Sequence, residues 1–397
     1  MPLLIAALGA FTVSLDSTVN IAFPDMAAAF GRGPGSIRWV IICYVLTYAL
    51  TSFAAGLVAD RVGPARVFTA GAWLSAVCFA AYVFAPSFAG LLALRVLQGV
   101  SGGCIYGTAP AVVTLSTPRE RRGRALGIMS LGLALGLAVG PPLGGLLVER
   151  FGWRAVFLFR APVAALLGAL AAARLARGLP APRALGSAGR RFRVSEAARW
   201  RVVQPLMLAF LANYAQFAVW LLVPFYLVGV LGLAAGAGGL LFMLTPIAAA
   251  AAAPVAGWVT DRWGPGWPVA AGLAVETLGL AVVSRFTADT PWPEVAAGLA
   301  LVGLGLGVFQ VPNLAQAMAE FPPSAHGAAG GLAFMSRTLG VVTGVQGAAL
   351  LFTWAEPGWG FGGAFALAFS GAAVVSAVGT ALAILSRPAA RLDAPAA

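Results

Sequence analysis

Long apolar runs alternate with short clusters of arginine, glycine and proline along almost the whole chain. The runs are about 20 residues long, which is the length that an α-helix needs to cross a hydrocarbon core of roughly 30 Å. The pattern predicts helices over residues 3–23, 39–59, 67–85, 88–115, 125–148, 153–175, 202–231, 237–259, 269–286, 295–318, 327–352 and 362–385. We therefore expect an all-α integral membrane protein with twelve transmembrane helices.

Composition agrees with this pattern. Of the 397 residues, 60% are hydrophobic and only 10% are charged, whereas a soluble domain is roughly half apolar and about a quarter charged. So few charges could not cover the surface of a water-soluble fold. The lipid bilayer is therefore the expected environment of the chain.

The basic residues, which are all arginine, give the chain a net charge of +12. On one side of the predicted helices they are 61, 66, 119, 121, 122, 124, 174, 177, 183, 190, 191, 193, 199, 201, 262, 387 and 391, and on the other side 32, 38, 150, 154 and 285. Loops rich in arginine stay in the cytoplasm. The asymmetry predicts a multi-pass protein of the cell membrane with both termini cytoplasmic. The same asymmetry accounts for the positive net charge, so binding to nucleic acid is not needed to explain that charge.

Several kinds of chemistry are excluded by the residues that are missing. Without lysine the chain cannot supply the phosphate-binding residue of a Walker-type ATP site. His326 is the only histidine, and the three cysteines stand singly in apolar runs, so we expect no metal, no cofactor and no enzymatic activity. Uphill transport must then draw on an ion gradient or on a partner.

The only long connection divides the chain into two parts. We expect a helix bundle over residues 1–175, a basic cytoplasmic linker over 176–201, a second bundle over 202–386 and a cytoplasmic tail over 387–397. The linker sequence RRFRVSEAARW is compatible with a short amphipathic helix on anionic headgroups. It is equally compatible with a solvated basic segment.

An internal repeat relates the two parts. AGLVADRVGP, residues 55–64, recurs as AGWVTDRWGP, residues 256–265, and each copy follows the second helix of its half. Such a repeat predicts two similar halves related by an axis along the membrane normal. An Asp-Arg pair beside glycine in a tight turn suits a hinge, because glycine permits the turn. The candidate switch loops are formed by Gly56, Asp60, Arg61, Gly63, Asp261 and Arg262.

The first repeat resembles the signature loop of the major facilitator superfamily, although Pro64 and Ala65 replace its basic pair. LDSTVNIAFP (15–24), LRVLQGVSGG (94–103) and GLALGLAVGPPLGG (132–145) resemble, in order, motifs of the drug/proton antiporter families. The resemblance implies two pseudo-symmetric six-helix bundles that rock around a central site. It also implies an antiporter motif at Gly132, Gly136, Gly140, Pro141 and Gly145. The glycines at every fourth position also predict a smooth face for close helix contact.

Asp16 is the strongest candidate for chemistry, because an ionisable residue inside a membrane helix is costly. Asp16 and Arg95 both lie about 10 to 12 Å from the outer ends of their helices, at 1.5 Å per residue. The superfamily resemblance implies that these helices are neighbours. Asp16 and Arg95 would then form a proton-coupling switch, or a permanent ion pair that fixes helix packing.

Polar and aromatic side chains at helical spacing predict the faces that line a substrate cavity. Interhelical hydrogen bonding is the alternative role for such residues. The candidates are Thr12, Asn20, Tyr44, Thr47, Gln98, Tyr106, Asn213, Gln216, Trp220, Gln310, Asn313 and Gln316.

Three further ionisable residues lie within the predicted helices. We expect Glu276 to have a structural partner. Arg160 is expected to extend toward the outer headgroups, and if it faced the cavity instead it would favour anionic or lipid-like substrates. Arg337 matches an arginine of the similar families, and its partner is open.

The leading functional prediction is a proton-coupled antiporter, acting as a monomer, that exports small hydrophobic or amphipathic compounds by alternating access. The alternatives are proton-linked uptake or export of a specific metabolite or lipid, and a membrane sensor on the same fold that does not transport. Protons are the expected coupling ion.

Overall fold

The computed structural model describes residues 1–118, 121–178, 200–319 and 326–386, and within these ranges it is helical almost throughout. The first half contains α1 (Pro2–Ser14), the 3₁₀ turn η1 (Leu15–Ser17), α2 (Thr18–Ile21), α3 (Phe23–Ala29), α4 (Pro34–Val62), α5 (Pro64–Ala81), the 3₁₀ turn η2 (Tyr82–Phe84), α6 (Phe88–Ser116), α7 (Arg122–Phe151), α8 (Ala155–Leu158) and α9 (Arg160–Gly178). The second half contains α11 (Trp200–Phe225), the π-turn η4 (Tyr226–Val230), α12 (Ala235–Phe242), α13 (Leu244–Trp263), α14 (Gly266–Val283), α15 (Trp292–Ala319) and α16 (His326–Leu385).

The described helices confirm the predicted count of twelve spans. Eleven segments are long and apolar enough to cross a membrane, and the last of them, Leu332–Leu385, has 54 residues. At 1.5 Å per residue this last segment is more than twice as long as one crossing requires. It bends at Gly360, whose φ of 63° is not helical. It therefore supplies both the eleventh and the twelfth spans.

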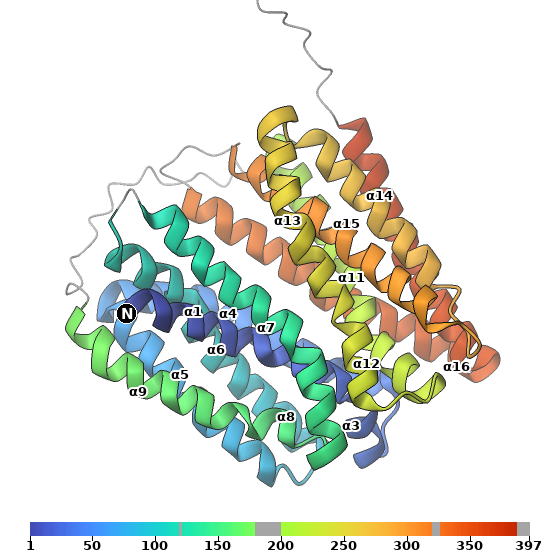
Figure 1. Ribbon diagram of the computed structural model, residues 1–397, viewed down its shortest axis with the longest axis horizontal. Coiled ribbons are helices and arrows are strands. Elements are labelled where there is room, and N and C mark those ends of the chain that lie inside the picture. The colour runs from blue at the N-terminus through green and yellow to red at the C-terminus, as the bar shows by residue number, and fades with distance from the viewer. Residues whose placement is uncertain (119–120, 179–199, 320–325, 387–397) are drawn as a thin grey trace, which may run out of the picture.

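The halves join at one end of the molecule and separate at the other (Figure 1). We call the face where α9 ends and α11 begins the linker side, and the opposite face the far side. On the far side a single hydrophobic cluster contains residues of both halves, such as Phe23 and Phe242. On the linker side each half has its own cluster, around Ile105 in the first half and Phe309 in the second.

Backbone contacts close the far side. Gly145 of α7 packs on the backbone of Ala235 in α12, and Gly239 of α12 packs on that of Pro141. Glu149 accepts a hydrogen bond at 2.8 Å from the backbone N–H of Gly236, in the first turn of α12. Carboxylates are favourable at that position because the N-terminal N–H groups of a helix carry partial positive charge. The contact therefore joins the two halves directly.

The glycine face of α7 packs against the first membrane helix. A Cβ atom at Gly132 would meet the carbonyl of Ala7, and one at Gly136 would meet the hydroxyl of Ser14. The hydroxyl of Ser17 donates to the carbonyl of Gly136 at 3.1 Å. Small residues let helix backbones approach closely in this way. The predicted close contact along this face is thus present, and it holds α1 and η1 beside the cavity.

The repeated loops have the predicted glycine turns. α4 ends at Gly63 with φ 96°, and α13 ends at Gly264 with φ 78°. Each glycine N–H donates to the carbonyl four residues earlier, at Ala59 and Thr260 respectively. Arg262 is exposed and lies over the rings of Trp258 and Trp263 at 5.8 and 5.9 Å.

Three parts of the sequence predictions lie outside the described residues. They are the side chain of Asp60, residues 179–199 of the predicted linker and the tail 387–397.

Candidate functional site

Asp16 lies where the first membrane helix is interrupted. The predicted span over 3–23 is present as one membrane segment, Pro2–Ile21, but within it the chain changes from α1 to the 3₁₀ turn η1 at Leu15, which the pattern did not indicate. Hydroxyl groups flank the turn: Ser14 donates to the carbonyl of Phe11 at 3.0 Å and Thr18 donates to that of Leu15 at 2.8 Å. Such side-chain bonds to backbone carbonyls compete with helical ones and bend helices.

The predicted pair between Asp16 and Arg95 forms in the structure as a two-pronged contact. Arg95 donates from Nη1 to Oδ1 at 2.7 Å and from Nη2 to Oδ2 at 3.0 Å. Its Nε donates to the carbonyl of Val40 at 2.8 Å. Arg95 is 1% exposed, whereas the side chain of Asp16 keeps 17% of its surface exposed toward the cavity. A paired guanidinium and carboxylate with this geometry form strong, directional hydrogen bonds.

Gln98 extends the network one turn along α6. Its Nε2 donates to Oδ1 of Asp16 at 2.7 Å, while its Oε1 accepts from Arg95 at 2.9 Å and from the hydroxyl of Tyr82 at 2.7 Å. Gln98 was predicted to line the cavity. It instead lies behind Asp16 and fixes the orientation of the carboxylate.

Arg160 is a second partner of Asp16, which the sequence did not reveal. It donates to Oδ1 of Asp16 at 3.1 Å and to the carbonyl of Thr12 at 3.1 Å. The expectation that Arg160 extends toward the outer headgroups is therefore wrong. The side chain is fully buried and lies over the ring of Phe79 at 4.2 Å. Asp16 thus carries one negative charge against two guanidinium groups.

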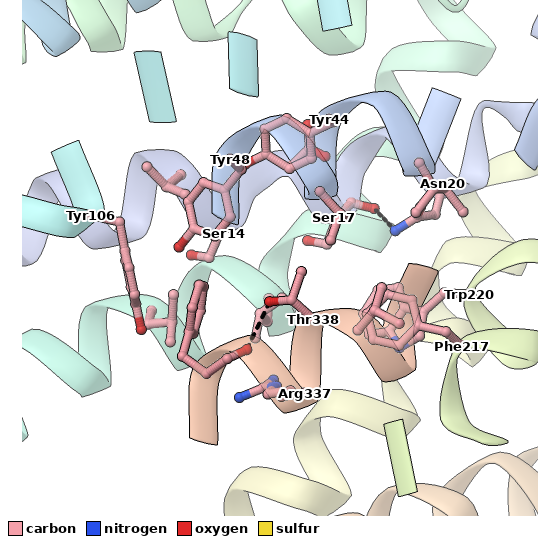
Figure 2. A pocket seen from close by; sticks show the side chains of 18 of the residues that line it. Ser14, Ser17, Asn20, Tyr44, Tyr48, Tyr106, Phe217, Trp220, Arg337 and Thr338 are labelled. Carbon is pink, nitrogen blue, oxygen red and sulfur yellow. Dashed lines mark hydrogen bonds between the residues drawn. The ribbon is translucent and has the colours of Figure 1, made fainter. Parts of the chain in front are cut away.

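A cavity of about 200 Å³ lies between the halves, with Asp16 in its wall (Figure 2). The first half contributes residues of α1, η1, α2, α4, α6 and α7, and the second half contributes residues of α11 and α16. The lining is largely aromatic and aliphatic. It is formed by Val13, Ser14, Asp16, Ser17, Asn20, Ile41, Tyr44, Val45, Tyr48, Arg95, Tyr106, Leu133, Leu137, Phe217, Trp220, Phe334, Arg337, Thr338 and Val341.

Four residues of the predicted cavity set line this space, namely Asn20, Tyr44, Tyr106 and Trp220. Tyr48, Phe217 and Phe334 also line it, although the sequence analysis did not select them. Aromatic spacing alone could not separate these rings from ordinary packing residues, because both kinds recur at helical intervals.

The remaining predicted cavity residues do not line this space, and their contacts explain why. Thr12 donates to the carbonyl of Leu8, and Thr47 packs on Gly99 of α6. Asn313 donates to the carbonyl of Pro205 at 3.0 Å. The others are Gln98, Asn213, Gln216, Gln310 and Gln316. For most of this set the correct role is the alternative one, hydrogen bonding between helices.

Two of these amides, Asn213 and Gln310, hold Arg337 at the edge of the cavity. Nε of Arg337 donates to Oδ1 of Asn213 at 3.1 Å. The Gln310 amide, oriented with its oxygen toward the guanidinium, accepts from Nη1 at 2.7 Å and from Nη2 at 3.3 Å. The open question about the partner of Arg337 is thereby answered with neutral groups.

Glu276 is buried away from this site. Its Oε2 lies 3.2 Å from the hydroxyl of Ser376, and it contributes nothing to the cavity lining. The partner across the helices agrees with the structural role expected for this residue.

Taken together, two helix bundles with a cavity between them and a charged cluster in its wall define a carrier for small molecules. The family model described as Major Facilitator Superfamily matches residues 5–345, and a second match covers 205–396. The chain belongs to the major facilitator superfamily, and it is a secondary transporter of the membrane and not an enzyme.

Known relatives cover most of the chain at modest identity. The chain is 25% identical over 395 residues to Riboflavin transporter RibZ of Clostridioides difficile (strain 630), which covers 86% of each chain. It is 28% identical over 384 residues to the Tetracenomycin C resistance and export protein of Streptomyces glaucescens, covering 83% of this chain and 71% of the relative.

The fold also matches a solved structure. A bacterial homologue of the human lysosomal transporter Spinster superposes with a TM-score of 0.82 and 15% identity, over 97% of this chain and 96% of the other. At this identity the likeness concerns the fold alone.

Proposed function

We propose that the chain is a proton-coupled antiporter that exports small hydrophobic or amphipathic compounds by alternating access. The observation that carries the proposal is the position of Asp16: this carboxylate lines the cavity between the halves and holds two buried guanidinium groups. A proton site and a substrate space therefore share one compartment. Substrate export is also in the name of the Streptomyces glaucescens relative.

Proton binding at Asp16 is linked to helix movement by charge. While Asp16 is ionised, Arg95 and Arg160 have a counter-ion within 3.1 Å. A protonated Asp16 would leave two buried guanidinium groups uncompensated, and removing one partner of a buried pair costs about 3–5 kcal/mol. The present arrangement is therefore stable only with Asp16 ionised, so a proton favours another arrangement of α6 and α9 around the first helix.

The direction of transport in this proposal follows from the contacts between the halves, which meet on the far side and are separate on the linker side. The arginine distribution predicts that the linker side is cytoplasmic, so the present state receives substrate from the cytoplasm. Rocking of the halves would open the far side, release substrate and admit a proton to Asp16. Return of the protonated carrier would deliver that proton inward, which completes an exchange.

Transport by the full chain in liposomes tests this proposal. Liposomes are loaded with one compound from a panel of cationic, neutral and anionic amphipathic compounds, and the external medium is then acidified. We expect the lumen to acidify faster when an accepted compound is present, and this acceleration to disappear in Asp16→Asn. If no compound in the panel changes proton movement, the antiport proposal is wrong and a sensor role gains support.

Asp16→Asn also tests the alternative of a permanent structural ion pair. If the variant folds and exchanges compound for protons at the wild-type rate, Asp16 serves packing only. Asp16→Glu preserves the charge and serves as the matched control.

A further inference from the structure

The cavity wall holds more positive than negative charge. Asp16, Arg95 and Arg337 are the charged residues that line it, and Arg160 binds Asp16 from behind. Three guanidinium groups against one carboxylate leave a net charge of +2. Among the described residues, no other carboxylate lines this cavity.

Arg337 is the guanidinium that forms no ion pair with Asp16, the single carboxylate of this cavity. The two salt bridges found among the described residues both use Asp16, with Arg95 and with Arg160. Asn213 and Gln310 accept hydrogen bonds from Arg337, but a neutral amide fixes the orientation of a guanidinium without neutralising its charge. A guanidinium has five N–H groups. Asn213 and Gln310 use one on each of Nε, Nη1 and Nη2, so one N–H on Nη1 and one on Nη2 remain for a ligand.

Aromatic rings surround the same space. Phe334, one turn before Arg337 on α16, lies 5.9 Å from the ring of Tyr48 and 6.2 Å from that of Tyr106. The hydroxyls of Tyr48 and Tyr106 make no hydrogen bond to any other residue in the described part of the chain. Across the cavity, Trp220 stacks with Phe217 at 6.1 Å. Figure 2 shows Arg337, Tyr48, Tyr106, Phe217 and Trp220 bordering one cavity, and Phe334 lines the same cavity.

We propose that this cavity binds aromatic organic acids, with the acid group on Arg337 and the ring system among Tyr48, Tyr106 and Phe334. This assignment deepens the antiporter proposal, and it rests on that proposal for the direction of transport. Charge selects the ligand class, because an anion meets a net attraction in this cavity and a cation meets a net repulsion. The N–H groups of Arg337 that Asn213 and Gln310 leave free donate charge-assisted hydrogen bonds to the acid group, which places that group beside Arg337.

Three test compounds with the same ring system and different charge separate the possibilities. Binding of 2-naphthoate, 2-naphthamide and 2-naphthylmethylammonium to the purified full chain is measured by equilibrium dialysis in nanodiscs of neutral lipid. We expect 2-naphthoate to bind at least tenfold more tightly than either of the others. Equal binding of the three compounds would overturn the proposal.

Variants of Arg337 test whether this residue causes the preference for 2-naphthoate. Arg337→Gln is expected to remove the preference for 2-naphthoate, and Arg337→Lys is expected to retain part of it because the charge remains. Arg285→Gln is the matched control, since Arg285 is exposed and outside the cavity lining. Thermal unfolding of each variant reports its folding. A preference that survives in folded Arg337→Gln would place the acid elsewhere and contradict the proposal.

A lipid headgroup offers a similar anionic group, so a second arm includes phosphatidylglycerol in the nanodiscs. We expect binding of 2-naphthoate to change less than twofold. Displacement by the lipid would overturn the assignment to a free aromatic acid.

The outcome is independent of the antiport proposal, because dialysis requires no transport. Loss of the acid preference with intact proton exchange would reject only the ligand class. Acid preference without proton exchange would reject only antiport.

Discussion

From the first half, Asp16 and Arg95 line the central cavity as an ion pair, and Arg160 forms a second ion pair with Asp16. From the second half, Arg337 faces it with only the amides of Asn213 and Gln310 for partners. The loops after the second helix of each half nevertheless repeat almost residue for residue, with a positive φ at Gly63 and Gly264. The glycine turns are thus shared by both halves, whereas the ionisable residues at the cavity are not.

We propose that this difference gives the two halves separate tasks. Two guanidinium groups stabilise the ionised form of Asp16, so protonation of Asp16 requires them to move, and this link between proton and movement would provide coupling in the first half. A guanidinium without a counter-ion attracts an anion, so the second half has the means for recognition.

The largest effect is expected from Asp16→Asn. Asparagine preserves the shape of the side chain but cannot cycle between charged and neutral forms, so proton-driven transport should fall at least about a hundredfold. Arg95 and Arg160 lose their counter-ion, with a destabilisation of about 3–5 kcal/mol. Proton flux in liposomes and thermal unfolding measure the two effects.

Folding of this variant can be supported separately. The double variant Asp16→Asn with Arg160→Gln removes one of the two uncompensated guanidinium groups and should unfold at a higher temperature than Asp16→Asn. Transport must remain absent in the double variant. Recovery of coupled flux would show that another group takes the proton.

The next effect is expected from Asn213→Asp, which makes the second half resemble the first. The Asn213 oxygen is 3.1 Å from Nε of Arg337, so a carboxylate of the same shape would form an ion pair there. It would also lose the hydrogen bond that Nδ2 of Asn213 donates to the carbonyl of Ala209 at 2.8 Å, so thermal unfolding must confirm that the variant is folded. Binding of 2-naphthoate should weaken about tenfold, because truly desolvated charge pairs contribute on the order of 1.5 kcal/mol or more. Equilibrium dialysis measures this loss, and unchanged affinity would mean that Arg337 does not hold the acid.

A smaller effect is expected from Glu149→Gln, which weakens the contact between the halves. A carboxylate at a helix N-terminus contributes about 0.3–1 kcal/mol, so the far side should open roughly two- to fivefold more often. Labelling of Ser17→Cys by an impermeant maleimide, in a background where Cys43, Cys78 and Cys104 are serine, measures the opening. Glu294→Gln, which changes an exposed acid of α15, is the control, and equal labelling in both variants would show that the bond to Gly236 does not hold the halves together.

The smallest effect is expected from Glu276→Gln. Glu276 is buried against Ser376 and away from the cavity, so both proton flux and 2-naphthoate binding should stay within about twofold of wild type. A loss of coupling comparable to that of Asp16→Asn would place a proton site in the second half and remove the contrast between the halves.

The helices could be predicted from the sequence with little loss. Apolar runs are long-range statistical features, and the predicted span 88–115 differs from α6 by a single residue at one end. The 3₁₀ turn at Leu15–Ser17 could not be predicted. It depends on hydrogen bonds that the hydroxyl groups of Ser14, Ser17 and Thr18 donate to backbone carbonyls, and the sequence does not show which carbonyls these are.

The candidate site was only partly predictable. The pairing of Asp16 with Arg95 followed from equal depth and from the family resemblance. The role of Arg160 did not, because depth along a helix does not reveal which way a side chain turns. The amides were placed in the cavity for their polarity, yet Gln98 and Asn213 bind the charged residues instead. Which polar groups satisfy one another is decided by packing between helices that are distant in the sequence.

Parallel assays of coupling and binding on Asp16→Asn and Arg337→Gln test the division of tasks most directly. We expect Asp16→Asn to lose proton exchange but to bind 2-naphthoate at least as tightly as wild type, since the cavity becomes more positive. We expect Arg337→Gln to lose the preference for 2-naphthoate but to keep proton exchange with neutral compounds. If either folded variant loses both activities together, the two halves do not have separate tasks.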